Sequence, residues 1–391
     1  MAAHGALHGV RILDLTRLLP GGVLTALLGD MGADVIKIEE PTRGDYMRQE
    51  DPKLGIESAA SWIVGRNKRS LAIDLKDPAG VDVFMRLADQ AAVIIESFRP
   101  GVADRLGIGF DVVVERNPAI VYASLSGYGS DGSRSQIPGH DINYISMSGV
   151  LGMTGTPSGQ PCPPGVQVGD LGGATILGMG ILAALFRAQI SGVGDHVEVA
   201  MYDAAMAWTS IHAGELWASG HVPNPGEMLL NGRYPCYNVY ECSDERFVAV
   251  GAIEEKFWAV FCDVIERPDL VERRMDPEAR VDVGETLRLR PRDEWVKLAG
   301  ESEACLTPVL TLDEALAHPF ATERLMVRRE THSELGNALT LGTPVRFQTH
   351  PTGIRRPPTH LGADSVAVLA EAGFSPAEID QLSSDGIVGR R

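Results

Sequence analysis

Cysteine is scarce in this chain of 391 residues, and its few copies are irregularly spaced. No two cysteines form a CxxC pair, and no histidine stands at zinc-finger spacing from them. An odd number of scattered cysteines is typical of free thiols in a reducing compartment. We therefore expect neither a disulfide framework nor a metal site. The cysteines are Cys162, Cys236, Cys242, Cys262 and Cys305.

Long apolar runs and a basic leader segment are missing too. The longest apolar run, 176–186, is shorter than the roughly 20 residues that a bilayer requires. No basic segment followed by an apolar stretch opens the chain, and its last residues, GIVGRR, match no lipidation or peroxisomal signal. We therefore expect a cytoplasmic protein without a membrane partner.

Positive charge is in deficit, with 35 Lys and Arg against 52 Asp and Glu and a formal net charge of −17. This balance argues against a nucleic-acid partner or an anionic membrane surface. Basic residues nevertheless gather in RNKRS (66–70) and SFRPG (97–101), and Arg105 follows. Arginines in loops beside strands favour a bound polyanion such as a phosphorylated cofactor. Solvated surface charge is the alternative for any one of them.

What the first half does contain is an alternation of strand-like and helical patterns. This βαβ spacing predicts an α/β fold, with a Rossmann-like parallel sheet covered by helices. A dinucleotide enzyme is the rival on such a fold, but TRLLPGG (16–22) follows the first strand in place of a GxGxxG fingerprint. The predicted strands are 10–15, 34–39, 70–74, 92–96, 120–124 and 196–199. The predicted helices are 22–31, 79–90, 172–189 and one beginning near 202.

The composition changes after residue 220. Residues 221–235 are rich in Pro, Gly and Asn and are interpreted as a linker. A hairpin, 237–241 with 246–252, then precedes helices at 255–265 and 292–299. We expect 236–325 to form a smaller α+β domain.

Two residues, His140 and Asp170, stand in the glycine-rich segments PGHDINY and VGDLGG. A histidine and a carboxylate that face one carbon from opposite sides can move a proton on and off it, which is racemase or epimerase chemistry. Asp170 can instead be the N-cap of the apolar helix that follows, and His140 can be an ordinary loop residue. Glycine-lined turns, where backbone can approach a ligand closely, favour the catalytic interpretation.

Several segments together resemble the family III CoA-transferase superfamily over most of the chain. They are GDMGADVIKIE (29–39), RNKRS (66–70), SFRPGV (97–102) and RLG (105–107). Further segments resemble the racemases of that superfamily, namely GHDINY (139–144), VGD (168–170), VGAIE (250–254) and ACLTPVL (304–310). The resemblance implies a racemase of fatty-acid metabolism that interconverts (2R)- and (2S)-2-methylacyl-CoA thioesters through an enolate.

The same resemblance implies the roles of individual residues. His140 and Asp170 are expected to be the two bases, and Glu254 to orient or charge His140. Glu40 stands where related racemases carry an arginine, and Arg43 is expected to take over a phosphate contact. No cofactor is expected beyond the CoA moiety of the substrate. That moiety is expected to lie along Ile73, Asp74, Leu75, Lys76, Ser97, Phe98, Arg99, Arg105, Gly139, Asp141, Ile142, Asn143 and Tyr144.

The resemblance also implies an interlocked homodimer. Residues 1–220 and 326–391 are expected to build the large domain, and the active site to lie between the large domain of one subunit and the small domain of the other. CoA transfer between carboxylic acids, through an Asp170 anhydride and thioester, remains the alternative activity. The superfamily's transferases generally lack the histidine, and some have a multiple-glycine loop that is missing between 231 and 251 here. A catalytically silent CoA-binding protein is a third possibility, against which His140, Asp170 and Glu254 together argue.

A two-base racemase needs one base protonated and the other free. Ordinary pKa values, about 6.5 for histidine and 3.9 for aspartate, favour imidazolium with carboxylate. Burial of Asp170 is expected to narrow that difference. Backbone N–H groups in the helix after Asp170 are expected to stabilise the enolate oxygen.

Overall fold

The computed structural model describes residues 4–155, 159–332 and 336–389, and the chain divides into two compact units. The first comprises Met1–Ser148, Val166–Trp208 and Pro319–Arg391, and the second comprises Gly149–Gly165 and Thr209–His318. The segment 221–235, interpreted above as a linker, falls inside the second unit, where the Asn231 side chain donates to the Met153 carbonyl over 2.8 Å. The expected linker at 221–235 and the expected domain boundary at 325–326 therefore do not coincide with the boundaries between these units, which fall after residues 148, 165, 208 and 318.

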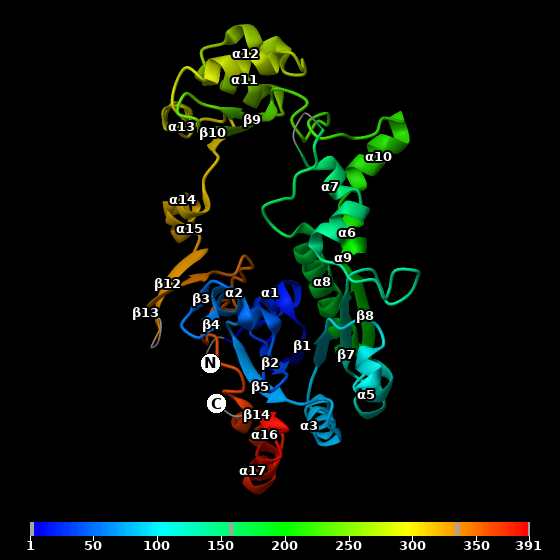
Figure 1. Cartoon of the computed structure of the whole chain (residues 1–391). Coiled ribbons are helices and arrows are strands. Elements are labelled where there is room, and N and C mark those ends of the chain that lie inside the picture. The colour runs from blue at the N-terminus through cyan, green and yellow to red at the C-terminus, as the bar shows by residue number, and fades with distance from the viewer. Residues whose placement is uncertain (1–3, 156–158, 333–335, 390–391) are drawn as a thin grey trace. The chain divides into compact units, whose positions relative to one another are not determined.

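A seven-stranded sheet forms the centre of the first unit (Figure 1). Its order is β14-β5-β2-β1-β6-β7-β8, and all neighbours are parallel except β14, which is antiparallel to β5. The predicted Rossmann-like parallel sheet is confirmed, and β14 adds an edge strand that was not predicted. The strands are β1 (Arg11–Leu15), β2 (Asp34–Glu39), β5 (Lys68–Ile73), β6 (Val93–Glu96), β7 (Val121–Ser126), β8 (Asp195–Ala200) and β14 (Val388–Gly389).

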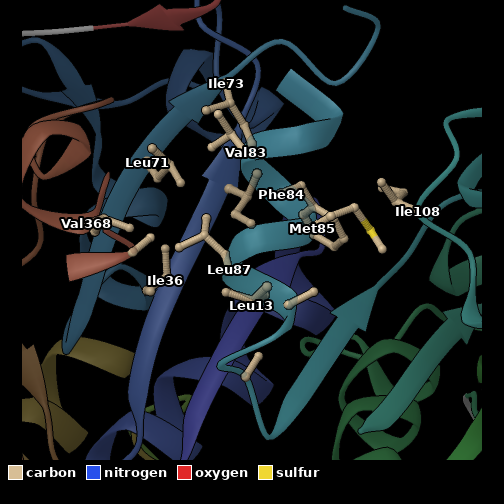
Figure 2. Packing of buried hydrophobic residues seen from close by; sticks show 14 of the residues in the cluster. Leu13, Ile36, Leu71, Ile73, Val83, Phe84, Met85, Leu87, Ile108 and Val368 are labelled. Atoms are coloured by element: carbon tan, nitrogen blue, oxygen red, sulfur yellow. The ribbon is translucent and has the colours of Figure 1, made fainter. Parts of the chain in front are cut away.

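Helices cover both faces of this sheet, because successive strand residues point to opposite sides. Ile12 packs into a core with α1 (Leu18–Asp30) and α8 (Val168–Ser191). Leu13 packs into another core with α3 (Pro78–Ala88), α16 (Ser365–Glu371) and α17 (Pro376–Ser384). Figure 2 shows Phe84 and Leu87 of α3 in this second core, together with Leu13 of the sheet. Fully burying one such side chain contributes about 1.5–3 kcal/mol to folding.

Helix α1 begins at Leu18, four residues before the predicted start at 22. Arg17 precedes it in an extended conformation, and its side chain makes no cap. The carboxylate of Asp45 instead accepts the Leu18 N–H, at 3.1 and 3.2 Å from its two oxygens. The helix starts early because a residue far along the chain satisfies its first free donor.

Helix α8 runs from Val168 to Ser191 and ends at Gly192, which has a φ of 70°. It is longer than the predicted 172–189. Among the described residues it is the one helix long and apolar enough to cross a membrane by length and composition alone, with a mean hydropathy of 1.6 and 33% of that window buried. The apolar part of this helix is therefore longer than the continuous apolar run 176–186 indicated. Its buried residues, mostly glycine and alanine, pack against α1, α9, β7 and β8.

The second unit contains a three-stranded antiparallel sheet of order β11-β10-β9. Trp258 and Trp295 are fully buried in its core, and their indole N–H groups donate to the carbonyls of Leu270 and Leu287 over 2.9 and 2.8 Å. This antiparallel sheet and the helices that accompany it confirm the smaller α+β domain, although the unit comprises Gly149–Gly165 and Thr209–His318 instead of the expected 236–325. Its strands are β9 (Tyr237–Glu241), β10 (Phe247–Gly251) and β11 (Leu306–Pro308). Its helices are α7 (Val150–Met153), α10 (Ser210–Ser219), α11 (Glu255–Val264), η2 (Pro268–Arg273), α12 (Ala279–Leu287), α13 (Arg292–Ala299) and α14 (Leu312–Ala317).

Shorter elements complete the first unit. The helices are η1 (Tyr46–Gln49), α2 (Ala59–Val64), α4 (Val102–Arg105), α5 (Phe110–Arg116), α6 (Asp141–Met147), α9 (Met201–Ala207) and α15 (Pro319–Glu323). The strands are β3 (Lys53–Leu54), β4 (Glu57–Ser58), β12 (Val327–His332) and β13 (Gly336–Leu341), which form two hairpins.

Candidate active site

His140 immediately precedes α6, in an extended backbone conformation, and its side chain is exposed. Its backbone N–H donates to Asn143 Oδ1 over 3.0 Å, which fixes the entry into the helix. The preceding glycine is sterically required, because a Cβ on Gly139 would lie 2.8 Å from Tyr144 Cε1. The Tyr144 hydroxyl also donates to the Gly139 carbonyl over 2.6 Å. The GHDINY motif is therefore a rigid turn that presents His140.

Asp170 lies in the first turn of α8, half-buried, and it is not the N-cap. The helix begins two residues earlier, and the carboxylate of Asp141 accepts the N–H groups of Gly169 and Asp170 through Oδ1, over 2.7 and 3.1 Å. The capping interpretation of Asp170 is therefore wrong. Three of the N–H groups at the start of α8 already have acceptors, since the Leu171 N–H bonds to the Gln167 carbonyl. Stabilisation of an enolate by this end of the helix stays a prediction.

The electrostatic environment of Asp170 is unusual for an aspartate. Burial and, to a smaller extent, the charge of Asp141 raise the pKa of its carboxyl to about 6, while His140 acts in the opposite direction. Asp170 in turn contributes, after burial, to raising the pKa of Tyr144 to about 12. His140 and Asp170 therefore lie within electrostatic reach of each other, and the Asp170 carboxyl titrates close to the ordinary range of an imidazole, about 6.5.

A pocket with about 550 Å³ of empty space opens at the carboxyl ends of β1, β2 and β5. Ligands of open α/β sheets bind at this edge. Of the residues expected to hold CoA, five line it: Ile73, Asp74, Leu75, Lys76 and Phe98. The binding of CoA by these five residues stays a prediction.

Arg17 also lines this pocket, and the sequence analysis missed it. Its guanidinium lies over the rings of Tyr46 and Phe98, at 5.2 and 5.3 Å from their centroids. A signal for it was present in the sequence, since Arg17 is the second residue after the first strand. Its backbone N–H donates to Ser97 Oγ over 2.9 Å, so the Ser97 hydroxyl supports this loop.

The other expected CoA contacts are more dispersed. Arg99 lines a neighbouring pocket with about 740 Å³ of empty space, where burial raises the pKa of Glu96 to about 7. Arg105 is exposed at the end of α4 and lines neither pocket. Ile142 and Asn143 are exposed on α6. The structure therefore gathers residues 73–76 with Phe98, and leaves the contacts of Arg99, Arg105 and α6 with CoA as predictions.

The basic segment RNKRS does not serve as an anion site. Arg66 pairs with Asp30 over 2.8 Å, buried Lys68 lies 3.5 Å from Asp14, and Arg69 pairs with Asp34 and Glu371 over 2.7 and 2.8 Å. These charges are neutralised inside the first unit. The polyanion interpretation of this segment is therefore wrong.

Glu40 lines the pocket at the sheet edge and holds a turn. Its carboxylate accepts the Thr42 hydroxyl at 2.7 and 2.8 Å and the Arg43 N–H at 2.8 Å. The Arg43 side chain is exposed. A phosphate contact by Arg43 stays a prediction.

Glu254 belongs to the second unit, where it precedes α11 with an exposed side chain. Its carboxylate contributes, after burial, to raising the pKa of the Cys305 thiol. The pairing of Glu254 with His140 stays a prediction. Within the described ranges, no group of three His, Cys, Asp or Glu side chains could hold a metal ion.

Known proteins match this chain in sequence and in fold. The model of CoA-transferase family III matches residues 7–365, so the chain belongs to that family. It is 34% identical over 396 residues to the alpha-methylacyl-CoA racemase of Mus musculus, covering 98% of this chain and 97% of that protein. It is also 31% identical over 368 residues to the acetyl-CoA:oxalate CoA-transferase of Acetobacter aceti, covering 90% and 92%.

Solved structures agree with this fold. The protein Rv3272 of Mycobacterium tuberculosis superposes with a TM-score of 0.79 at 28% identity, covering 94% of this chain and 99% of that one. A CAIB/BAIF family protein from Brucella suis has a TM-score of 0.83 at 24% identity, covering 94% and 100%, which supports the fold alone. The chain is therefore an enzyme of the family that contains both CoA-transferases and racemases.

Proposed function

We propose that this enzyme is a racemase that interconverts (2R)- and (2S)-2-methylacyl-CoA thioesters. The observation that carries the proposal is the electrostatic interaction of His140 with the Asp170 carboxyl. A carboxyl with a pKa of about 6 lies within electrostatic reach of a histidine. Both are held on short, hydrogen-bonded turns. The identity of 34% to a racemase over nearly the whole chain supports the same activity.

The chemistry needs two bases on opposite faces of the α-carbon. One base takes the α-proton, and the electron pair of the broken C–H bond moves into the thioester to form an enolate. The other base then gives its proton to the opposite face, and the enolate electrons form the new C–H bond. The first base ends protonated and the second ends free, so the next turnover runs in the opposite sense or follows proton exchange with water.

The pKa of Asp170 suits this exchange. An ordinary aspartate would leave the proton almost entirely on the imidazole, since the reference values differ by about 2.6 units. Burial of Asp170 narrows this difference. Either residue then begins a turnover as the protonated partner at little cost in free energy.

The proposal extends to the ligand and to the assembly. CoA would lie along the pocket formed by residues 73–76 and Phe98, with no other cofactor, in a cytoplasmic enzyme. An interlocked homodimer would bring the partner's Glu254 to His140. Large apolar side chains on α8 support a second subunit, since Met179, Phe186 and Ile190 are each more than 60% exposed. Sedimentation of the F186D variant as a monomer, where the parent protein sediments as a dimer, tests this assembly.

CoA transfer through Asp170 is the second candidate, favoured by the 31% identity to an acetyl-CoA:oxalate CoA-transferase. A transferase would form an anhydride at the Asp170 carboxylate, which hydroxylamine traps during turnover. A racemase forms no acyl-enzyme.

The decisive experiment follows one epimer of a 2-methylacyl-CoA in deuterated water by NMR. We expect deuterium at the α-carbon and loss of stereochemical purity with the parent protein, and strongly reduced rates with H140A and D170N. The H4A variant, which removes an exposed histidine near the N-terminus, is the matched control. Absence of exchange together with a hydroxylamine-trapped Asp170 would instead establish CoA transfer.

A further inference from the structure

We propose that Asp141 is a positioning residue. Its carboxylate links the turn that carries Asp170 to the segment that carries His140, and its negative charge makes the Asp170 carboxylate a better acceptor of the proton that the two bases exchange. The proposal rests on the racemase function proposed above. It assigns to Asp141 a role different from the CoA contact expected from the sequence.

The tie is made by a single oxygen. Asp141 Oδ1 accepts the Gly169 N–H over 2.7 Å and the Asp170 N–H over 3.1 Å. Asp141 follows His140 directly in the chain and opens α6. The carboxylate of Asp141, the residue next to His140, is therefore hydrogen-bonded to the backbone of Asp170.

Gly169 is what allows the carboxylate to come this close. A Cβ at Gly169 would lie 3.2 Å from Asp141 Oδ1 and 3.3 Å from Ile145 Cγ2. Both distances are shorter than an ordinary van der Waals contact. The glycine before Asp170 therefore serves the approach of Asp141.

The tie also changes the charge around Asp170. A free helix N-terminus stabilises a carboxylate and lowers its pKa. Here Asp141 occupies two of those donors and adds a negative charge, so the pKa of Asp170 rises with burial as the larger cause. An uncharged hydrogen-bond acceptor at position 141 would fix the same geometry but would not raise the pKa of Asp170 by its charge.

The other titratable groups described around α8 either stay neutral or interact with other partners. Tyr144 of α6 faces Asp170 but stays neutral, because burial raises its pKa to about 12. On α9 and β8, Asp203 and Glu198 interact with each other. Asp30 at the end of α1 is paired with Arg66. Within the described part of the chain, the charges that act on the Asp170 carboxyl are those of Asp141, which raises its pKa, and His140, which lowers it.

Two substitutions separate geometry from charge. The Asn side chain of D141N keeps an oxygen that can accept both N–H groups but has no charge. We expect the acidic limb of the kcat/KM profile for α-proton exchange to move to lower pH by about one unit. The Ala of D141A removes the acceptor, and we expect a loss in kcat of about 100-fold.

The matched control is E378Q. Glu378 caps α17 by accepting the Ser375 N–H over 2.7 Å, so its substitution also removes one capping charge and keeps the shape. We expect its pH profile to coincide with that of the parent protein. An unmoved acidic limb in D141N would overturn the charge role, and an unchanged kcat in folded D141A would overturn the positioning role. If D141A does not fold, D141N decides alone.

A measurement without turnover separates this proposal from the racemase function. The carboxyl carbon of Asp170, labelled with carbon-13 and identified by its loss in D170N, is titrated by NMR. We expect a pKa of about 6 in the parent protein and a lower pKa in D141N. An equal pKa in both proteins overturns the proposal even if racemisation is observed. A lowered pKa without any α-proton exchange would uphold the electrostatic effect and refute the racemase function.

Discussion

The guanidinium of Arg66 and the carboxylate of Asp30 form a bidentate ion pair, with Nε and Nη2 at 3.0 and 2.8 Å from the carboxylate oxygens. Both side chains are at least nine-tenths buried. The Asn67 amide donates to the same carboxylate over 2.8 Å. The pair links the last residue of α1 to the segment before β5, and it makes Arg66 a structural residue.

Removing Arg66 should therefore destabilise the protein. In R66A the buried Asp30 carboxylate loses its counter-charge, and we expect the free energy of unfolding to fall by about 3–5 kcal/mol. Urea denaturation measures this. R116A is the control, because the Arg116–Asp89 pair is exposed and should contribute about 0–1 kcal/mol. Equal losses in the two variants would contradict the structural assignment.

Asp170 should reduce the stability of the fold at neutral pH. Because its pKa is raised to about 6, the folded protein binds the proton more tightly than the unfolded chain does. Stability is therefore lost as the pH rises from about 4 to about 6. In D170N this penalty is absent, and we expect a gain of about 1–2 kcal/mol at pH 7.5, discounted because the side chain is partly exposed.

The check is thermal unfolding of D170N and the parent protein at several pH values. The advantage of D170N should nearly disappear at pH 3.5, where the carboxyl is protonated in the folded protein and mostly protonated in the unfolded chain. A D170N advantage that is constant with pH would show that the carboxyl of Asp170 carries no burial penalty.

Gly139 should tolerate no side chain. The added methyl group of G139A would lie 2.8 Å from Tyr144 Cε1 and 3.1 Å from the Tyr128 hydroxyl. We expect a loss of stability of about 1–3 kcal/mol and a fall in kcat/KM of about 100-fold, since His140 is displaced. Calorimetry and α-proton exchange measure the two effects. G214A is the control, because its added methyl group meets no atom within 4 Å apart from the neighbouring backbone of its own helix; similar losses there would remove the steric explanation.

Arg17 should contribute to binding of the CoA moiety. In R17A a cationic side chain is lost from the pocket at the carboxyl ends of β1, β2 and β5. We expect KM for the acyl-CoA to rise about tenfold, which corresponds to about 1.4 kcal/mol, with kcat nearly unchanged. Steady-state kinetics at constant ionic strength measures this, with R116A as the control for loss of a surface arginine. A changed kcat at constant KM would place Arg17 in the chemical step instead.

The candidate site was predictable in part because its residues sit in distinctive short motifs. Gly139 and Tyr144 belong to one motif, and the steric contact between them is a local property. The sequence could also assign Asp170 to the beginning of an apolar helix. It could not show that Asp141 caps this helix, because the two segments meet only after the chain has folded, and an N-cap at Asp170 itself was the simpler local solution.

The basic segment 66–70 illustrates the opposite outcome. Arginines and a lysine beside a strand suggest an anion site when their partners are unknown. Their partners, Asp30, Asp14 and Asp34, come from other strands and helices of the same unit. A positive charge has the same appearance in the sequence whether it faces a phosphate or a buried carboxylate.

By itself, the sequence determined the positions of the parallel strands, the helices between them and the motifs that carry His140 and Asp170. These depend on periodicity and on glycine over a few neighbouring residues. The tertiary structure alone decided where α1 begins, how β14 joins the sheet and which groups neutralise one another. Those outcomes depend on contacts between distant parts of the chain. One example is the backbone N–H of Ser70, which donates to the carboxylate of Asp364 over 2.9 Å, although the two residues are 294 positions apart in the sequence. No local pattern encodes such a partner, because the free energy of a buried charge depends on what the fold places beside it.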